Sequence, residues 1–361
     1  MHTINTSLET SLKTSNSLLH KRLAAAALLA LTLPAVNVAH AASWLNCEGS
    51  PIKWNSNRSN MYISTTSFPA GSSWDAALQN AMWHWNNVKG SGFTYYVGRD
   101  TDGGNSLGNG VNEIYFNAGQ TGSALAVTRT RYHCYWAFGW QRGIDETDMA
   151  FNTSLSWNLG AVNYANLGSP FHFESVAMHE LGHALGLKHS DGVMATMNSF
   201  YPSGGSLGNY KEIDALADDR LGARSLYGDG TTERDVSGSA FQRTGAGTSG
   251  LVASPTWAYR GSTVNIGVSI ANLGTSTASF NIGFYLSTDG FISTGDRLLG
   301  TNTGASIGSG GLLTFTRSLT IPSNVAPGTY YLGFMPDNNN ALGEANEGNN
   351  GQPMPRTITI Y

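Results

Sequence analysis

Apolar residues follow helical spacing in one early segment of the chain, where Ser72 supplies a hydroxyl cap and Asp75 an acidic residue in the first turn. The predicted buried face of this helix consists of Trp74, Ala77, Leu78, Ala81, Met82, Trp85 and Val88. A second helix is expected after Ser169-Pro170, because a capping residue followed by Pro at the first helical position is a start signal. Its core contacts would come from Phe173, Val176, Ala177, Ala184 and Leu185.

Short stretches of β-type pattern lie between these helices, and the predicted strands are 61–65, 112–116, 124–128 and 145–152. Strand and helix signals do not alternate with the regular rhythm of a parallel α/β sheet. The pattern therefore predicts an α+β domain, a twisted sheet packed on long helices. We interpret the carboxylates of 145–152 as structural.

The composition changes at Asp229 to Gly, Ser, Thr and Ala, which predicts a flexible linker over 229–250. Period-two alternation follows, and the predicted strands are 264–270, 280–286, 312–315, 328–334 and 357–360. Several short strands separated by turn signals predict an antiparallel β-sandwich over 251–361.

The N-terminal segment has the pattern of a signal peptide. Lys21-Arg22 precede an apolar run from Leu23 to Leu33, and Ala39-His40-Ala41 forms a small-residue cleavage site. The run is too short to span a bilayer, so an uncleaved anchor is the weaker interpretation. We therefore expect residues 1–41 to be removed and the remaining chain to be secreted, without a transmembrane segment.

Charge and length narrow the class of protein. Only 12% of the residues are charged, the formal net charge is −4 and 44 residues are Gly, which argues against a nucleic-acid partner. A chain of 361 residues is long enough for two domains.

The residue pattern that indicates a chemical function most specifically lies between His179 and His189. His179 and His183 are four residues apart, so both imidazoles project from one face of a helix. Gly186 permits a sharp turn after the helix, which would return His189 to the same ion. Three nitrogen ligands suit Zn²⁺ and leave one position for water, and Glu180 is placed to accept a proton from that water.

This His-Glu-x-x-His-x-x-Gly-x-x-His pattern resembles the metzincin zinc metallopeptidases, and Ser190 after the third His resembles the matrixin-like branch. That family also has a Met on a turn beneath the metal. Met197 fits the matrixin spacing better than the alternative Met194, and 216–228 looks like the last matrixin helix. The resemblance implies a zincin-like catalytic domain over 42–228, with the cleft along the edge of the sheet.

The function implied is a secreted zinc endopeptidase that hydrolyses extracellular polypeptides. Glu180 would be the general base, and a substrate backbone would bind the edge strand by strand addition. Two alternatives belong to other classes of protein. One is an adhesin with a vestigial metal domain, which an intact Glu180 disfavours, and the other is a zinc-stabilised shell component without turnover.

Cys47 and Cys134 are the two cysteines of the chain. In an exported protein the pair is read most simply as one disulfide. The alternative is a cysteine switch in which Cys47 blocks the zinc. We favour the disulfide, because 44–50 lack the Pro-Arg-Cys-Gly consensus of matrixin propeptides.

The last hundred residues resemble the CARDB family of immunoglobulin-like bacterial domains. The resemblance rests on 272–274, 285–289, 327–332 and 346–350, and its name implies a cell-surface or matrix ligand. Two acidic loops, 99–105 and 337–350, could bind Ca²⁺, and the second could also bind a glycan. An exposed loop is the favoured interpretation of both.

Overall fold

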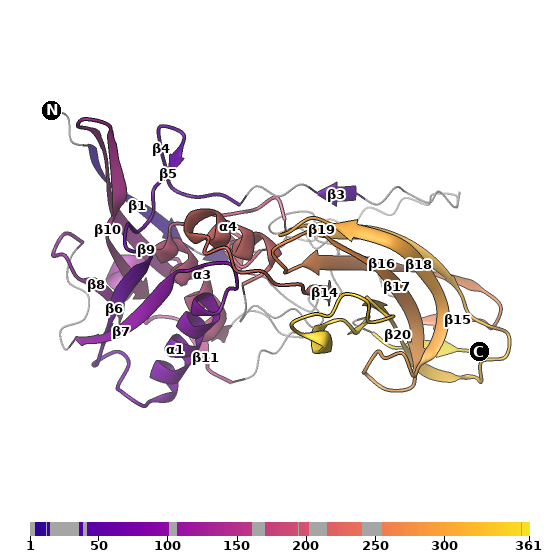
Figure 1. Ribbon diagram of the computed structural model, residues 1–361. Helices are drawn as coiled ribbons and strands as arrows, with labels where there is room; N and C mark the ends of the chain where they lie inside the picture. The colour runs from indigo at the N-terminus through magenta and orange to yellow at the C-terminus, as the bar shows by residue number, and fades with distance from the viewer. Residues whose placement is uncertain are drawn as a thin grey trace, which may run out of the picture.

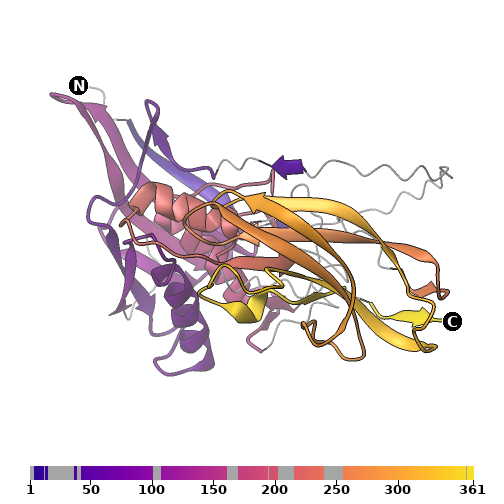
Figure 2. The ribbon, with the colours of Figure 1, turned by 45° about the vertical axis from the view of Figure 1, so that its right-hand side comes forward.

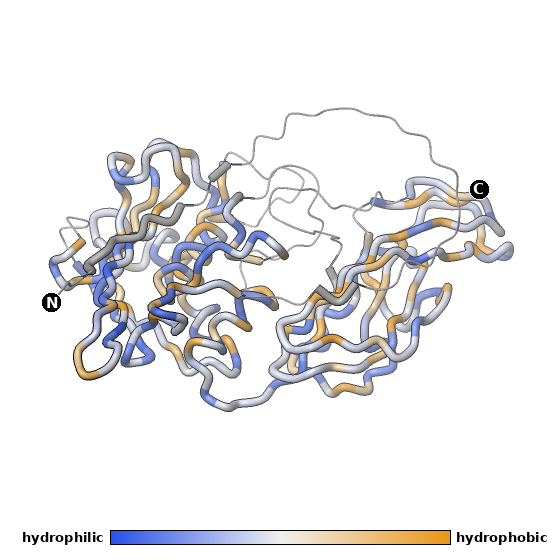
Figure 3. The backbone as a smooth tube through the Cα atoms, turned by 90° about the horizontal axis from the view of Figure 1, so that it is seen from above, coloured by the Kyte–Doolittle hydropathy of each residue, from blue (hydrophilic) through white to orange (hydrophobic). Residues whose placement is uncertain are grey.

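The computed structural model describes residues 4–11, 13–14, 36–38, 42–100, 107–160, 170–193, 195–201, 215–239, 255–354 and 356–361. The described chain forms two bodies, an N-terminal one of mixed helix and sheet and a C-terminal one of strands (Figure 1). Viewed from above, hydrophobic segments run through both bodies (Figure 3).

A six-stranded sheet forms the N-terminal domain, in the order β1-β9-β10-β8-β6-β7. The strands are β1 (Ile4–Ser11), β6 (Arg58–Ser64), β7 (Thr94–Asp100), β8 (Asn112–Phe116), β9 (Ala126–Trp136) and β10 (Trp140–Phe151). β9 runs antiparallel to β10, whereas β10, β8, β6 and β7 are mutually parallel. The helices are α1 (Ser73–Asn86), α2 (Ala118–Thr121), α3 (Phe173–Leu185) and α4 (Ala217–Tyr227). Two-residue strands complete the domain: β4 (Asn46–Cys47), β5 (Ser50–Pro51), β11 (Trp157–Asn158), β12 (Phe171–His172) and β13 (Phe200–Tyr201).

The first predicted helix corresponds to α1, with Ser72 as its cap: the Ser72 hydroxyl accepts a hydrogen bond from Asp75 N. The second helix begins later than predicted. Residues after Pro170 are extended, because β12 pairs in parallel with β11. His172 is the cap of α3, and its Nδ1 accepts a hydrogen bond from Ser175 N at 3.2 Å.

An aromatic cluster fixes the start of α3 against the sheet. Phe173 is fully buried, and its ring lies 4.7 Å from Phe151, 5.1 Å from Trp74 and 5.7 Å from Phe68. Phe116 and Trp157 complete the cluster. Offset and edge-on aromatic pairs add to the burial energy, so the N-terminus of α3 is held at one position on the sheet.

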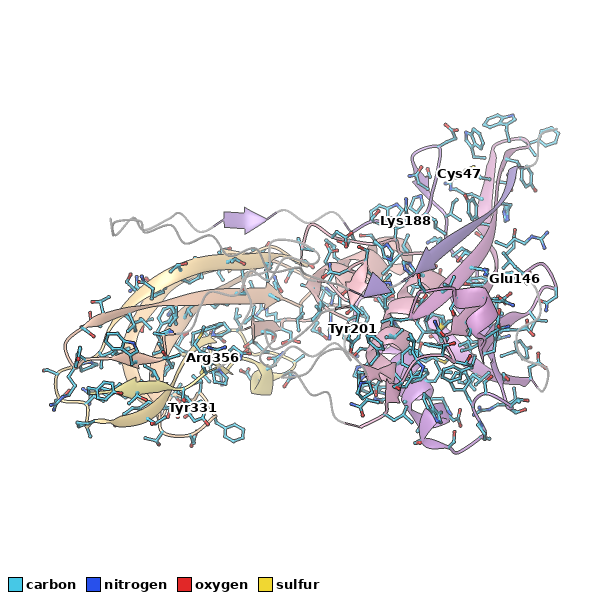
Figure 4. All side chains as sticks on the ribbon, turned by 180° about the vertical axis from the view of Figure 1, so that it is seen from behind. Cys47, Glu146, Lys188, Tyr201, Tyr331 and Arg356 are labelled. Carbon is cyan, nitrogen blue, oxygen red and sulfur yellow. A yellow bond between two sulfur atoms is a disulfide. The ribbon has the colours of Figure 1, made fainter. Side chains whose placement is uncertain are left out.

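β9 and β10 form a long hairpin that projects beyond the sheet (Figure 1). Cys134 lies near its tip and is bonded to Cys47, with Cα atoms 5.8 Å apart. Figure 4 shows Cys47 beside this hairpin. The predicted disulfide is therefore present, and it ties the β4–β5 turn to β9.

The C-terminal domain contains two sheets that share one apolar core, and their long strands curve together in Figure 2. One sheet has the order β14-β16-β19-β3, and the other has β15-β22-β20-β17-β18 with β21 beside β20. The strands are β3 (Val36–Val38), β14 (Val236–Ser239), β15 (Trp257–Ala258), β16 (Thr263–Asn272), β17 (Ala278–Ser287), β18 (Arg297–Ile307), β19 (Leu312–Thr320), β20 (Gly328–Pro336), β21 (Gln352–Pro353) and β22 (Ile358–Ile360). A short helical turn, η1 (Glu347–Asn349), follows β20.

The predicted linker differs from the structure in its first half. β14 pairs antiparallel with β16, and Val236 is fully buried in the C-terminal core. Residues 229–239 therefore belong to ordered structure, whereas 240–254 lie outside the described residues. The physical reason is pairing: a short segment with one apolar residue becomes a strand when a neighbouring strand supplies the hydrogen bonds.

Parts of the predicted signal peptide form edge strands. β1 pairs antiparallel with β9, β2 (Lys13–Thr14) pairs with β13, and β3 pairs with β19. β1 and β3 each lie at the end of a sheet, so the remaining strands of both sheets stay paired without them. In the described part of the chain, no helix is long and apolar enough to cross a bilayer.

α4 connects the two domains. Arg224 donates from Nη1 to Gly274 O and from Nη2 to Leu273 O, both at 2.7 Å. Leu273 also joins a small apolar cluster with Ala217 of α4 and with Ala271 and Leu312 of the C-terminal sheet. The C-terminal domain is thus packed directly on the last helix of the first domain.

Candidate metal centre

α3 is buried along nearly its whole length and carries His179, Glu180 and His183. Aromatic side chains from elsewhere in the domain donate hydrogen bonds to its carbonyl oxygens: Trp54 Nε1 to Ala184, Trp85 Nε1 to Met178, Tyr95 Oη to Leu181 and Tyr227 Oη to Leu185. Two of these carbonyls, those of Ala184 and Leu185, lie in the last turn and have no helical partner of their own. The helix that carries the two imidazoles is therefore held rigidly from several sides.

A glycine turn returns the chain to the helix. Gly186 has φ +110°, which a side chain would strain, and a Cβ there would lie 3.2 Å from Ile52 O. Leu187 N then bonds Gly182 O at 3.0 Å, and His189 follows. The ligand nitrogens of His179, His183 and His189 lie within 4.8 Å of one another. The structure thus brings the three predicted ligands together.

The hydrogen bonds of the imidazoles fix their tautomers. His179 Nδ1 lies 2.8 Å from Thr196 O, and His183 Nδ1 lies 2.9 Å from Leu187 O. A carbonyl can only accept, so both Nδ1 atoms are protonated and both Nε2 atoms keep a lone pair. His183 Nε2 is 3.2 Å from His189 Nε2. In metal sites, such a hydrogen bond at Nδ1 orients the imidazole so that Nε2 can bind the metal.

Burial keeps these imidazoles neutral. Burial first, and the neighbouring histidines next, lower the pKa of His179 to about 3 and the pKa of His183 well below its usual value. His179 Nε2 is buried, and no described residue forms a hydrogen bond with it. This nitrogen has a buried lone pair with no described hydrogen-bond donor, and two further imidazoles lie beside it. The arrangement fits a divalent metal that binds nitrogen ligands, and it fits zinc best.

Met197 packs against α3 at Gly182, which lies between the two histidines of the helix. It is 1% exposed, and a Cβ placed on Gly182 would lie only 2.2 Å from its sulfur and 3.0 Å from Trp85 Cζ2. Gly182, between His179 and His183, therefore leaves the space that Met197 fills. Met194, the alternative candidate for this position, lies outside the described residues.

Two family models match the chain on either side of residue 229. The model of the matrixin family matches residues 53–228, and the CARDB model matches residues 251–353. The chain carries a matrixin domain followed by a CARDB domain.

The curated relatives of the matrixin domain match over a short stretch. Matrix metalloproteinase-2 of Drosophila melanogaster is 37% identical over 81 residues, which cover 22% of this chain and 10% of that protein. Metalloendoproteinase 1 of Glycine max is 42% identical over 69 residues, or 19% of this chain and 21% of that protein. The chain therefore spans only a small part of the length of these relatives.

Solved structures similar to the chain include a CARDB domain from Pyrococcus furiosus in complex with di-metal ions. It has 17% identity, covers 36% of this chain and 90% of its own, and has a TM-score of 0.25. A β-glucosidase from Listeria innocua has 14% identity and a TM-score of 0.23, with 37% of this chain and 17% of its own covered. At such TM-scores, neither structure supports an argument for this chain.

Asp219 of the matrixin domain holds the turn beneath the histidines, a role that the sequence did not reveal. Its carboxylate accepts hydrogen bonds from Thr196 N at 2.7 Å, Met197 N at 3.1 Å and Leu216 N at 3.0 Å. Burial, and next the nearby Asp218, raises the pKa of Asp219 to about 7. Thr196 O in turn orients His179, so α4 supports the candidate metal centre through one side chain. The Asp218-Asp219 pair in the last helix was the available signal.

Thr128 on β9 contacts the carboxylate that follows the first histidine. Its hydroxyl donates to Glu180 Oε2 at 2.7 Å and lies 3.1 Å from Glu180 O, and both residues are fully buried. Spacing along the chain could not have found this contact, because it depends on β9 lying beside α3.

Two other features lie near the centre. His172 caps α3, and its Nε2 lies 3.0 Å from Gly160 O. The first acidic loop, 99–105, is not described from Thr101 onward, so its calcium site stays untested.

Proposed function

We propose that the chain is a secreted zinc endopeptidase that hydrolyses extracellular polypeptides. The observation that carries this proposal is the meeting of three histidine side chains beside Glu180, on a helix next to the antiparallel strand β9. The matrixin match supports it. Within this proposal, residues 42–228 form an α+β zincin-like domain and residues 251–361 an immunoglobulin-like antiparallel sandwich.

His179, His183 and His189 would hold zinc through their Nε2 atoms. When bound, zinc supplies a Lewis acid that polarises a peptide carbonyl and lowers the pKa of a water. Glu180 accepts the proton of the attacking water and passes it to the departing amine. Thr128 would hold one Glu180 oxygen and keep the carboxylate in one orientation, and Met197 would form the apolar floor.

The substrate would bind as an added strand along β9. β1 supports this proposal, because it already pairs antiparallel with the outer edge of β9, from Ile4 opposite Cys134 to Ser11 opposite Val127. Removal of residues 1–41 would leave that edge free for an extended substrate, with main-chain groups supplying the affinity.

Export is part of this proposal. The basic residues, apolar run and Ala-x-Ala site at the N-terminus support it, as does a disulfide, which persists in oxidising compartments. N-terminal sequencing of the secreted chain should begin at Ala42. A secreted chain that retains residues 1–41 would contradict the cleavage.

Removal of the metal tests the function. Chain lacking residues 1–41 should cleave casein, and 1,10-phenanthroline should abolish at least about 95% of the cleavage because the three histidines alone cannot activate water. Added Zn²⁺ should restore it. Cleavage that persists after phenanthroline, with no zinc left by elemental analysis, would contradict the proposal.

Thr128 should act as a positioning residue for Glu180. Thr128→Val should lower kcat about 10- to 100-fold with KM nearly unchanged, because a hydrogen bond to a charged group contributes about 1.5–3 kcal/mol. Thr128→Ser should recover most of the loss. The matched control is Thr130→Val, two residues along β9, whose hydroxyl lies 3.4 Å from Thr147 Oγ1. An equal loss in Thr130→Val would show that the effect is general to the strand.

A further inference from the structure

The loop that follows β20 in the CARDB domain gathers three carboxylates. Oxygen atoms of Asp337, Glu344 and Glu347 lie within 4.8 Å of one another, with Asp337 buried, Glu344 half-buried and Glu347 exposed. Among the described residues, none of the three forms an ion pair with Lys or Arg. Arg234 reaches this loop, but its Nη1 donates to Leu342 O at 3.2 Å and not to a carboxylate. Three carboxylates therefore lie together without a direct ion pair to any described Lys or Arg.

The same loop contains buried amide oxygens without donors. Asn350 is 3% exposed, and no residue in the described part of the chain donates to its Oδ1. Its Nδ2 donates to Glu344 Oε2 at 2.5 Å, so the Asn350 side chain faces the carboxylate of Glu344. Asn338 Oδ1 and Asn349 Oδ1 are also buried with no described donor. A buried acceptor normally has a partner, so three in one loop call for an explanation.

An excess of oxygen acceptors over donors is what a hard divalent cation requires. Ca²⁺ binds six to eight oxygens from carboxylates, amide carbonyls and water in a flexible geometry. The described donor set here has neither His nor Cys, which disfavours zinc. We propose that Asp337, Glu344, Glu347 and Asn350 form a Ca²⁺ site in the CARDB domain.

Hydrogen bonds already shape this loop around the proposed site. Asp337 accepts from Ala341 N at 3.1 Å and Leu342 N at 2.9 Å, and Glu344 N bonds Glu347 Oε1 at 2.9 Å. Each carboxylate oxygen has two acceptor positions, so these bonds leave capacity for a cation. They orient the carboxylates before the ion arrives.

The site also reaches the segment that joins the domains. Glu344 Oε1 accepts from Val236 N at 2.5 Å, and Ala345 N bonds Arg234 O at 2.9 Å. Asn349 Nδ2 donates to Asp235 Oδ1 at 2.9 Å. Calcium at the loop would therefore fasten residues 234–236, which follow α4, to the CARDB core.

Titration of CaCl₂ into the zinc-loaded chain lacking residues 1–41 tests the site, with Glu180→Ala included to prevent self-cleavage. Calorimetry should give one Ca²⁺ per chain with a Kd of about 10⁻⁴–10⁻³ M, typical of extracellular modules. In scanning calorimetry, 5 mM Ca²⁺ should raise the unfolding temperature of the CARDB domain by about 5–10 °C. Mg²⁺ at 5 mM should give less than half of that shift.

Glu344→Gln and Asp337→Asn should abolish binding and the shift. Glu347 is exposed, so Glu347→Gln should keep the fold and weaken Ca²⁺ binding about tenfold. This variant still tests the site if a substitution at a buried carboxylate unfolds the domain. Asp289→Asn, which removes one exposed carboxylate from the same domain, should bind as the parent does. No binding at 5 mM Ca²⁺, or binding unchanged in Glu347→Gln and Glu344→Gln, would overturn the proposal. Both results are independent of peptidase activity.

Discussion

Glu180→Ala should lower kcat/KM for a peptide substrate by about 10³-fold while the chain retains one zinc. General acid–base catalysis contributes about 10²–10⁴-fold, and the substitution removes the carboxylate that would shuttle the proton. His179 and His183 do not depend on Glu180 for their orientation, because Thr196 O and Leu187 O bond them. Zinc content should therefore be unchanged.

The measurement is steady-state cleavage of a fluorogenic peptide, together with elemental analysis of zinc. Glu180→Gln should be equally inactive, because an amide has the shape of the carboxylate but cannot accept the proton. Glu174→Gln is the matched control on the same helix: its carboxylate faces Asn80 and His84 of α1, so kcat/KM should stay within about twofold. If Glu180→Ala retained more than a tenth of the activity, the proposed base would be wrong.

The double variant Cys47→Ala/Cys134→Ala should lose about 3–4 kcal/mol of unfolding free energy. The two cysteines are 87 residues apart, and a cross-link over a loop of that length limits the unfolded chain strongly. For a domain of this size the melting temperature should fall by about 10 °C. The β4–β5 turn would then be held to β9 by packing alone.

Thermal and urea unfolding, followed by circular dichroism, measure this loss. Reduced parent chain should unfold like the double variant, and reductant should leave the double variant unchanged. The loss should be in stability, and the metal content of the folded variant should match the parent. Melting within about 2 °C of the parent would mean that packing alone fixes the turn.

The sequence predicted the elements whose own pattern determines them. α1 has a complete apolar face and a Ser72 cap, and the motif around His179 specifies a helix and a Gly turn. β18 and β7 were not predicted, because nearly all residues of β18 are exposed or half-buried and β7 lacks period-two alternation. Only the neighbouring strands define them. β14 was assigned to the linker for the same reason.

The supporting contacts of the metal centre could not be predicted from spacing. Thr128 lies 52 residues from Glu180, and Asp219 lies 23 residues from Thr196. Each is one polar residue in an element whose pattern indicates only burial. Their roles depend on the order of strands in the sheet and on where α4 packs, which a single chain pattern does not encode. The position of His172 as a cap likewise depends on the pairing of β12 with β11.

The contact of Arg224 with the carbonyls of Leu273 and Gly274 has a consequence for how substrates are encountered. α4 both supports the turn beneath the histidines and contacts the CARDB domain. It therefore sets the orientation of the two domains relative to each other. A substrate that carried a ligand for the CARDB domain would meet β9 at an effective concentration set by that geometry. Selection among polypeptides would then depend on where each is captured, as well as on the residues that flank its scissile bond.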